Sequence, residues 1–139
     1  MQYREAPFGY FLVLDRGDEV LESVTRFATE TGVRAASFTG IGAIGKLTLA
    51  FYDLETEQYE KRSWEQALEV ASLIGNLAEV DGGPYPHIHG IFCTPDFQAF
   101  GGHVFEAHVS ITIELSVLTA PDLIRRQPVD FCDLKLMDL

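Results

Sequence analysis

The hydrophobic period of this chain changes after residue 31, and that change limits the folds open to it. Residues 18–31 place apolar side chains at every third or fourth position, which is typical of an amphipathic helix. The apolar positions are Val20, Val24, Phe27 and Ala28. Asp18 is a suitable N-cap, and Gly32 is a natural C-terminal stop. From Val33 onward the period changes to two, so we expect one helix followed by strands.

Alternating segments fill most of the remaining chain. The expected strands are Tyr10–Leu14, Val33–Gly40, Lys46–Tyr52, Tyr59–Trp64, Leu68–Glu79, His87–Cys93, His103–Leu118 and Val129–Met137. Polar turns at Asp53–Gln58 and Thr94–Gln98 join neighbouring strands into hairpins, and Asp81–Pro84 is a loop. We therefore predict an α+β fold, a mostly antiparallel β-sheet with one main packed α-helix.

Two glycine-containing segments interrupt these strands. Gly75-Asn76, in the middle of Leu68–Glu79, predicts either a bulge or a close backbone approach. Asn76 itself fits a pocket hydrogen bond and turn chemistry equally well. The segment Gly40–Gly45 matches Gly-x-Gly-x-x-Gly, but an alternating segment follows it instead of a helix. A loop or kinked strand of small residues is therefore favoured over a dinucleotide site.

Composition excludes several classes of protein. The 139 residues, 47% of them hydrophobic, are enough for one domain over residues 1–139. A formal net charge of −11 opposes direct nucleic-acid binding. The start, Met1–Glu5, does not resemble a secretory signal, and no stretch is long and apolar enough for a membrane span, so we expect a cytoplasmic protein. Cys93 and Cys132 are expected to be buried thiols.

Three of the four histidines fall within a short apolar region. His87 and His89 are separated by one residue, so on a strand both imidazoles point to the same face. His103 follows at hairpin distance, after two glycines, and can lie beside them. Three imidazole nitrogens and an open position are typical of catalytic zinc sites. The alternative is a set of hydrogen-bonded pocket histidines. In a regular strand, the five-residue spacing places His108 on the opposite face, unless a bulge intervenes.

Glu114 is the other candidate site residue. It lies in the apolar run 111–115, where an unpartnered carboxylate is costly to bury. Glu114 could accept a hydrogen bond from an imidazole N–H or act as a general base. The alternative is a solvent-facing strand residue or a salt bridge at a subunit contact. No nucleophile motif or phosphate-binding loop accompanies it, so the sequence leaves open whether the protein is an enzyme.

Several segments, taken in order, resemble the plant and prokaryote conserved (PPC) domain family. Ala36–Ala43 contains Gly-Ile-Gly-Ala, and Leu47–Asp53 resembles the following strand, which ends in Tyr-Asp. Glu69–Asn76 is similar to the family's Glu-Ile-Leu-Ser-Leu-x-Gly-Asn segment. The remaining matches are Pro86–His89, Phe100–His103 and Glu114.

The resemblance implies an antiparallel α/β domain assembled as a homotrimer. It also implies that His87, His89 and His103 cluster, as they do in relatives that hold a metal ion, zinc being the expected one. Plant members follow AT-hook segments, and stand-alone relatives are often labelled DNA-binding. This chain has no Arg-Gly-Arg-Pro hook, and Ser63–Leu68 departs from the plant pattern Gly-Arg-Phe-Glu.

Two functions are consistent with that resemblance. One is a metal-binding trimer with a small-molecule or enzymatic role. The other is a DNA- or transcription-associated assembly module without catalytic activity.

Overall fold

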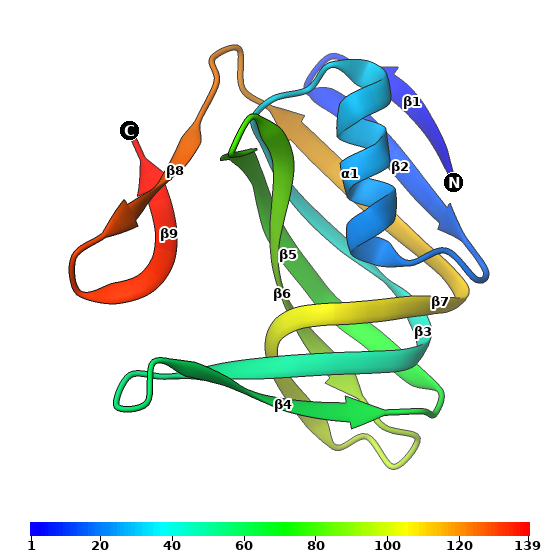
Figure 1. Ribbon diagram of the computed structural model, residues 1–139. Helices are drawn as coiled ribbons and strands as arrows, with labels where there is room; N and C mark the ends of the chain where they lie inside the picture. Colours follow the sequence, from blue (N-terminus) through cyan, green and yellow to red (C-terminus); the bar gives the residue numbers. More distant parts are fainter.

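The computed structural model describes residues 1–139 and contains one helix and a nine-stranded sheet (Figure 1). The elements are β1 Gln2–Ala6, β2 Gly9–Asp15, α1 Val20–Thr31, β3 Ala36–Asp53, β4 Gln58–Trp64, β5 Leu68–Val80, β6 Gly83–Cys93, β7 Ala99–Thr119, β8 Arg125–Val129 and β9 Cys132–Asp138. Apart from one parallel pair between β5 and β8, all pairings are antiparallel, which confirms the predicted sheet.

Two long strands, β3 and β7, organise the molecule because each takes part in two regions of the sheet. The C-terminal half of β7 lies between β2 and the start of β3, and its N-terminal part pairs with β6. Since β6 also pairs with β5, and β5 with β3, these four strands close on themselves. This closure brings the first residues of β7 beside the middle of β6, where the histidines lie.

The helix α1 forms where the sequence predicts it, but its N-cap is Glu19 and not Asp18. The Glu19 side chain accepts a hydrogen bond from the Glu22 backbone N–H and another from the Ala107 backbone N–H of β7. Asp18 instead accepts from the Asp15 backbone N–H and pairs with the N-terminal amine. Gly32 ends the helix in the left-handed conformation, as predicted.

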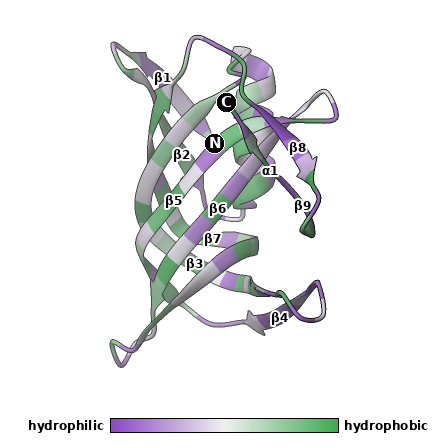
Figure 2. Cartoon of the chain, turned by 90° about the vertical axis from the view of Figure 1, so that its left-hand side faces the viewer, coloured by the Kyte–Doolittle hydropathy of each residue, from purple (hydrophilic) through white to green (hydrophobic).

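Apolar side chains of the helix and of alternate strand positions form one core. Figure 2 shows apolar and polar residues alternating along the strands, the pattern from which the period-two segments were predicted. The largest fully buried side chains are Phe27, Phe92, Leu12, Leu14, Ile44, Leu47, Leu73, Leu77, Ile88, Ile113, Leu115 and Val20. The helix packs against β6 and β7, and so one end of α1 lies near the histidine-bearing strands.

The structure explains the glycines in both of the segments noted above. Gly42 has φ 151° beside register shifts in β3, so Gly40–Gly45 is a kinked strand and no helix follows it. Gly75 lies in regular pairing, with no bulge. A Cβ there would lie 2.4 Å from the Phe38 ring and 2.7 Å from the His87 carbonyl oxygen, so the glycine allows a close approach.

Four details of the predicted structure need correction. The polar strand β1 was not predicted, and the two expected strands Val33–Gly40 and Lys46–Tyr52 are one strand, β3, which begins only at Ala36. The expected final strand is a hairpin of β8 and β9, because Asp130 and Phe131 form a turn. Cys93 and Cys132 are half-buried and not fully buried. The one helix has 12 residues, and no helix of this chain could cross a bilayer.

Candidate metal centre

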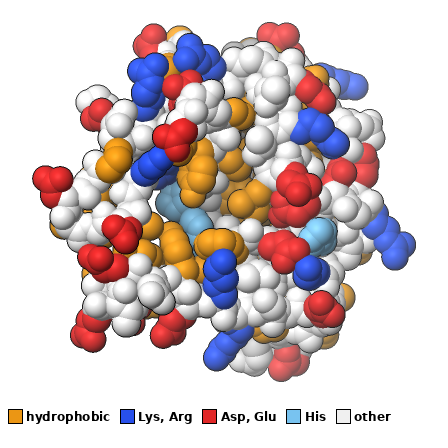
Figure 3. Space-filling model, viewed as in Figure 1, with side chains coloured by type: hydrophobic (Ala, Val, Ile, Leu, Met, Phe, Trp, Pro, Cys, Tyr) orange, Lys and Arg blue, Asp and Glu red, His pale blue; other side chains and the backbone are white.

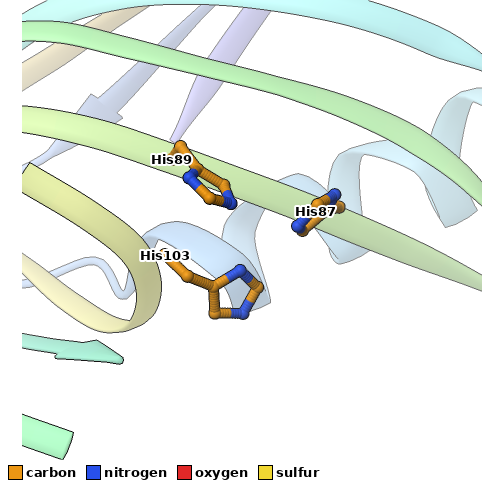
Figure 4. Close-up of side chains that lie close together, drawn as sticks. All are labelled: His87, His89 and His103. Atoms are coloured by element: carbon orange, nitrogen blue, oxygen red, sulfur yellow. The ribbon is translucent and has the colours of Figure 1, made fainter. Parts of the chain in front are cut away.

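Two paired strands carry the three histidines. His87 and His89 lie on β6, on either side of the fully buried Ile88, so both imidazoles project from the outer face. His103 lies on β7 directly opposite His89 in the register. Figure 4 shows the three rings facing one another across these strands. The structure thus brings together the three residues that the spacing predicted.

The geometry of the cluster suits a metal ion. One ring nitrogen from each histidine lies within 4.8 Å of the others, and the ring centroids are 5.0 to 5.3 Å apart. Nitrogen ligands of a tetrahedral zinc ion at 2.0–2.1 Å lie about 3.3 Å from one another. Small rotations of the rings would therefore bring the nitrogens to bonding distance.

Electrostatics keep two of the rings in the form that binds metal. Burial, followed by the charge of Arg126 and the neighbouring histidines, lowers the pKa of His87 from 6.5 to about 4. Burial and His89, followed by Arg126, lower the pKa of His103 to about 4 as well. Both imidazoles are therefore neutral at pH 7, the form that binds a metal ion. The donor set fits zinc.

Aromatic residues surround the cluster. Tyr59 of β4 stacks on His103, with ring centroids 5.4 Å apart and planes 24° from parallel, and Phe105 contacts both rings by its edge. Figure 3 shows histidine atoms at the bottom of a hollow in this face, with hydrophobic side chains around them. A cavity of about 690 Å³ continues from His103 and Tyr59 to residues of α1, including Leu21. The cluster is thus open to a small molecule.

A second, smaller cavity of about 310 Å³ lies between the histidines and the β8–β9 hairpin. It is lined by His87, His103 and Tyr59 and by Arg126 of β8. Arg126 donates hydrogen bonds to His87 Nδ1 (2.9 Å) and to Asn76 Oδ1 (2.8 Å). Of the two alternatives left open for Asn76, the structure therefore supports the side-chain hydrogen bond over turn chemistry.

Arg126 is the site residue that the sequence analysis missed. Arg125 and Arg126 are adjacent in a strand, so alternation requires that one of them points inward. Arg125 is exposed and pairs with Glu79, whereas Arg126 is only 9% exposed. Alternation predicts that one of the two arginines points inward. The pairing of β8 with β5 determines which arginine it is and which residues it contacts.

The remaining candidates lie elsewhere. Glu114 is exposed and lines a separate depression beside Phe11 and Ile41, so it is a solvent-facing strand residue and does not touch the histidines. His108 is outside the cluster, and its Nε2 lies 2.9 Å from Glu106 Oε1. The opposite face expected from its spacing is wrong, because a register shift between β3 and β7 interrupts the alternation between His103 and His108.

Comparison with known proteins agrees with the sequence resemblance. The model of the Plants and Prokaryotes Conserved (PCC) domain, the family abbreviated PPC above, matches residues 1–121. The chain belongs to this family. No curated protein matches it.

Solved structures of PPC-like proteins are similar over nearly the whole chain. A protein from Ralstonia eutropha JMP134, described as a "putative DNA-binding protein", is 30% identical with TM-score 0.93, covering 99% of this chain and 95% of that one. A metal-containing protein from Archaeoglobus fulgidus is 28% identical with TM-score 0.86, covering 97% and 95%. A PPC protein from Pyrococcus horikoshii is 26% identical with TM-score 0.86, covering 99% and 95%.

Proposed function

We propose that this PPC protein binds a divalent metal ion, zinc, through His87, His89 and His103, and that the metal takes part in binding or converting a small molecule. The observation that carries the proposal is the cluster itself, whose three ligand nitrogens lie within 4.8 Å of one another. The similar Archaeoglobus structure, described as metal-containing, supports it.

The surroundings favour an open metal site over a closed structural one. His89 is exposed, and only three protein ligands gather at the cluster, which leaves a position for water or a ligand. A zinc ion held in this way acts as a Lewis acid and lowers the pKa of a bound water. Tyr59 and Phe105 contact His103 from the cavity side and restrict its movement.

Metal analysis of protein purified without added metal tests the proposal. We expect about one zinc per chain in the wild type and less than about a tenth in H89A, because two imidazoles hold zinc much more weakly than three. H108A is the matched control, since it removes a histidine outside the cluster. Metal below a tenth of an equivalent in the wild type, unchanged in H89A, would show the metal role to be wrong.

We further propose that the protein is a homotrimer. Large apolar side chains are exposed on three strands of one part of the sheet, where the strand order is β2-β7-β3-β5. Phe11 of β2 is 50% exposed, Ile41 of β3 59%, and Ile74 of β5 57%. Together with Glu114 they lie on or beside the separate depression described above. An apolar surface of this kind on several strands is typical of a subunit contact.

The second candidate is an assembly module associated with DNA or transcription. The description of the similar Ralstonia structure favours it. A formal net charge of −11 per chain opposes direct contact with phosphates, so any association with DNA would be indirect. The metal analysis separates the two candidates, because in an assembly module the histidines would be structural and the protein would hold no metal.

A further inference from the structure

A buried arginine without a counter-ion lies beside the histidine cluster. Arg126 is 9% exposed and takes part in none of the ion pairs of the molecule. A buried charge is costly unless an opposite charge or a full set of hydrogen bonds compensates it. Arg126 is the one charged side chain among the buried residues, so its lack of a carboxylate partner needs an explanation.

The hydrogen bonds of Arg126 leave one edge of its guanidinium group incomplete. Nη2 donates to Asn76 Oδ1 and His87 Nδ1, and Nη1 donates to the Lys135 carbonyl oxygen at 3.2 Å. Nε is buried and has no partner. Nε and Nη2 lie on the same edge, the edge that carboxylates bind with two parallel hydrogen bonds.

Metal binding would release more of that edge. Because Arg126 donates to His87 Nδ1, this nitrogen holds the lone pair and Nε2 carries the proton of the neutral ring. His87 can bind a metal through Nε2 only if the proton moves to Nδ1, and through Nδ1 only if Arg126 moves aside. In either case Nη2 loses its bond to His87, and the edge formed by Nε and Nη2 can accept a ligand beside the metal.

The cavities indicate what kind of anion fits. Arg126 lines the 310 Å³ cavity together with His103 and Tyr59, which also line the 690 Å³ cavity. The larger cavity presents apolar groups, among them Phe105 and Val104. An inorganic oxyanion would leave that apolar space unfilled, whereas an organic acid can place its apolar part there.

We propose that Arg126 is the anion-recognising residue of the site, and that the ligand is a small organic carboxylate whose carboxyl group binds the guanidinium edge while its apolar part enters the larger cavity. The proposal rests on the proposed metal site, with the carboxylate lying between metal and arginine. The one carboxylate that lines the smaller cavity, Asp133, forms no ion pair with Arg126 and so does not replace the ligand.

Isothermal titration calorimetry with mandelate, a 2-hydroxy acid with one aromatic ring, tests the proposal at pH 7. Both zinc-loaded and EDTA-treated protein are titrated, with neutral mandelamide and inorganic phosphate as comparison ligands. We expect mandelate to bind the wild type, mandelamide not to bind, and R126Q to weaken mandelate binding by at least about tenfold, because two charge-assisted hydrogen bonds are lost. R125Q is the matched control, since Arg125 is exposed and paired with Glu79.

A second variant keeps the test decisive if R126Q does not fold. N76D places a carboxylate at the atom that already accepts from Nη2, so it should supply the missing counter-ion and also weaken mandelate binding. The inference is overturned if mandelate does not bind the wild type, whether or not phosphate binds. It is also overturned if mandelate binds folded R126Q or N76D as tightly as it binds the wild type.

Zinc content, measured on the same samples, reports separately on the metal. If zinc is absent but mandelate binds the EDTA-treated wild type and not R126Q, the proposed metal function fails and the role of Arg126 stands.

Discussion

At the scale of single residues, the site depends on keeping imidazoles neutral in a half-buried position. His87 is half-buried and lies beside the charged Arg126, so its protonation would place a second positive charge in a poorly solvated volume. His103 is protected in the same way and is also covered by Tyr59. Because of this arrangement, the stability of the protein without metal depends on pH.

The metal-free protein should lose stability as the pH falls below about 6.5. Histidines in the unfolded chain bind protons there, whereas His87 and His103 in the folded protein do so only near pH 4, so the unfolded state is favoured across that range. H87N keeps an acceptor for Arg126 and removes one titrating group. Between pH 7 and 5.5 its free energy of unfolding should fall less than that of the wild type, by up to about 1 kcal/mol.

Urea unfolding of EDTA-treated protein measures this difference, at pH values that stay above the isoelectric point of about 4.6. H108N is the control, because His108 lies outside the cluster. Equal losses for wild type and H87N would contradict the pKa assigned to His87.

At this scale, the sequence predicts the contacts that depend on local periodicity and not those between segments far apart in the chain. The shared face of His87 and His89 is a local consequence of period two, and the approach of His103 needs only a hairpin. Arg126 was not predicted because its partner Asn76 lies 50 residues earlier and is reached through the pairing of β8 with β5. Local periodicity carries no information about such a pairing.

At the scale of elements, glycines decide how closely the strands that hold the site can pack. The sequence indicates the position of Gly75 but does not distinguish a bulge from a close approach, because that depends on Phe38 of another strand. Similarly, the irregularity within β3 was predicted only as a loop or kink at Gly40–Gly45, and none was predicted within β7. The polar strand β1 escaped prediction because its residues are mostly exposed and carry no apolar alternation.

G75A should therefore destabilise the fold and disturb the site together. The added methyl group would lie 2.4 Å from the Phe38 ring and 2.7 Å from the His87 carbonyl oxygen, so β5 and β6 must move apart at His87. We expect a loss of about 1–3 kcal/mol in the free energy of unfolding and a reduced zinc content.

The matched control is G83A in β6, where a new Cβ would have no atom closer than 3.9 Å. Denaturant unfolding and metal analysis of both variants provide the comparison. If G75A were as stable as G83A and held as much zinc, the close approach would not position His87.

At the scale of the whole molecule, net charge and exposed apolar surface have opposite effects on the association of chains. Each chain carries a formal charge of −11, so a trimer would carry 3 × −11 = −33. Such repulsion favours separate chains, while burial of the exposed apolar residues of β2, β3 and β5 favours association. The balance between these two effects should depend on salt, because ions screen the repulsion and leave apolar burial intact.

Sedimentation at about 10 mM and about 500 mM NaCl should therefore show a larger trimer fraction at high salt. I41D adds a charge at a side chain that is 59% exposed beside Phe11, and it should shift the protein to monomers at both salt concentrations. L54D is the matched control, since Leu54 is 75% exposed but lies in the turn between β3 and β4. Association that weakens with salt, or that L54D and I41D affect equally, would show that this surface does not hold the trimer together.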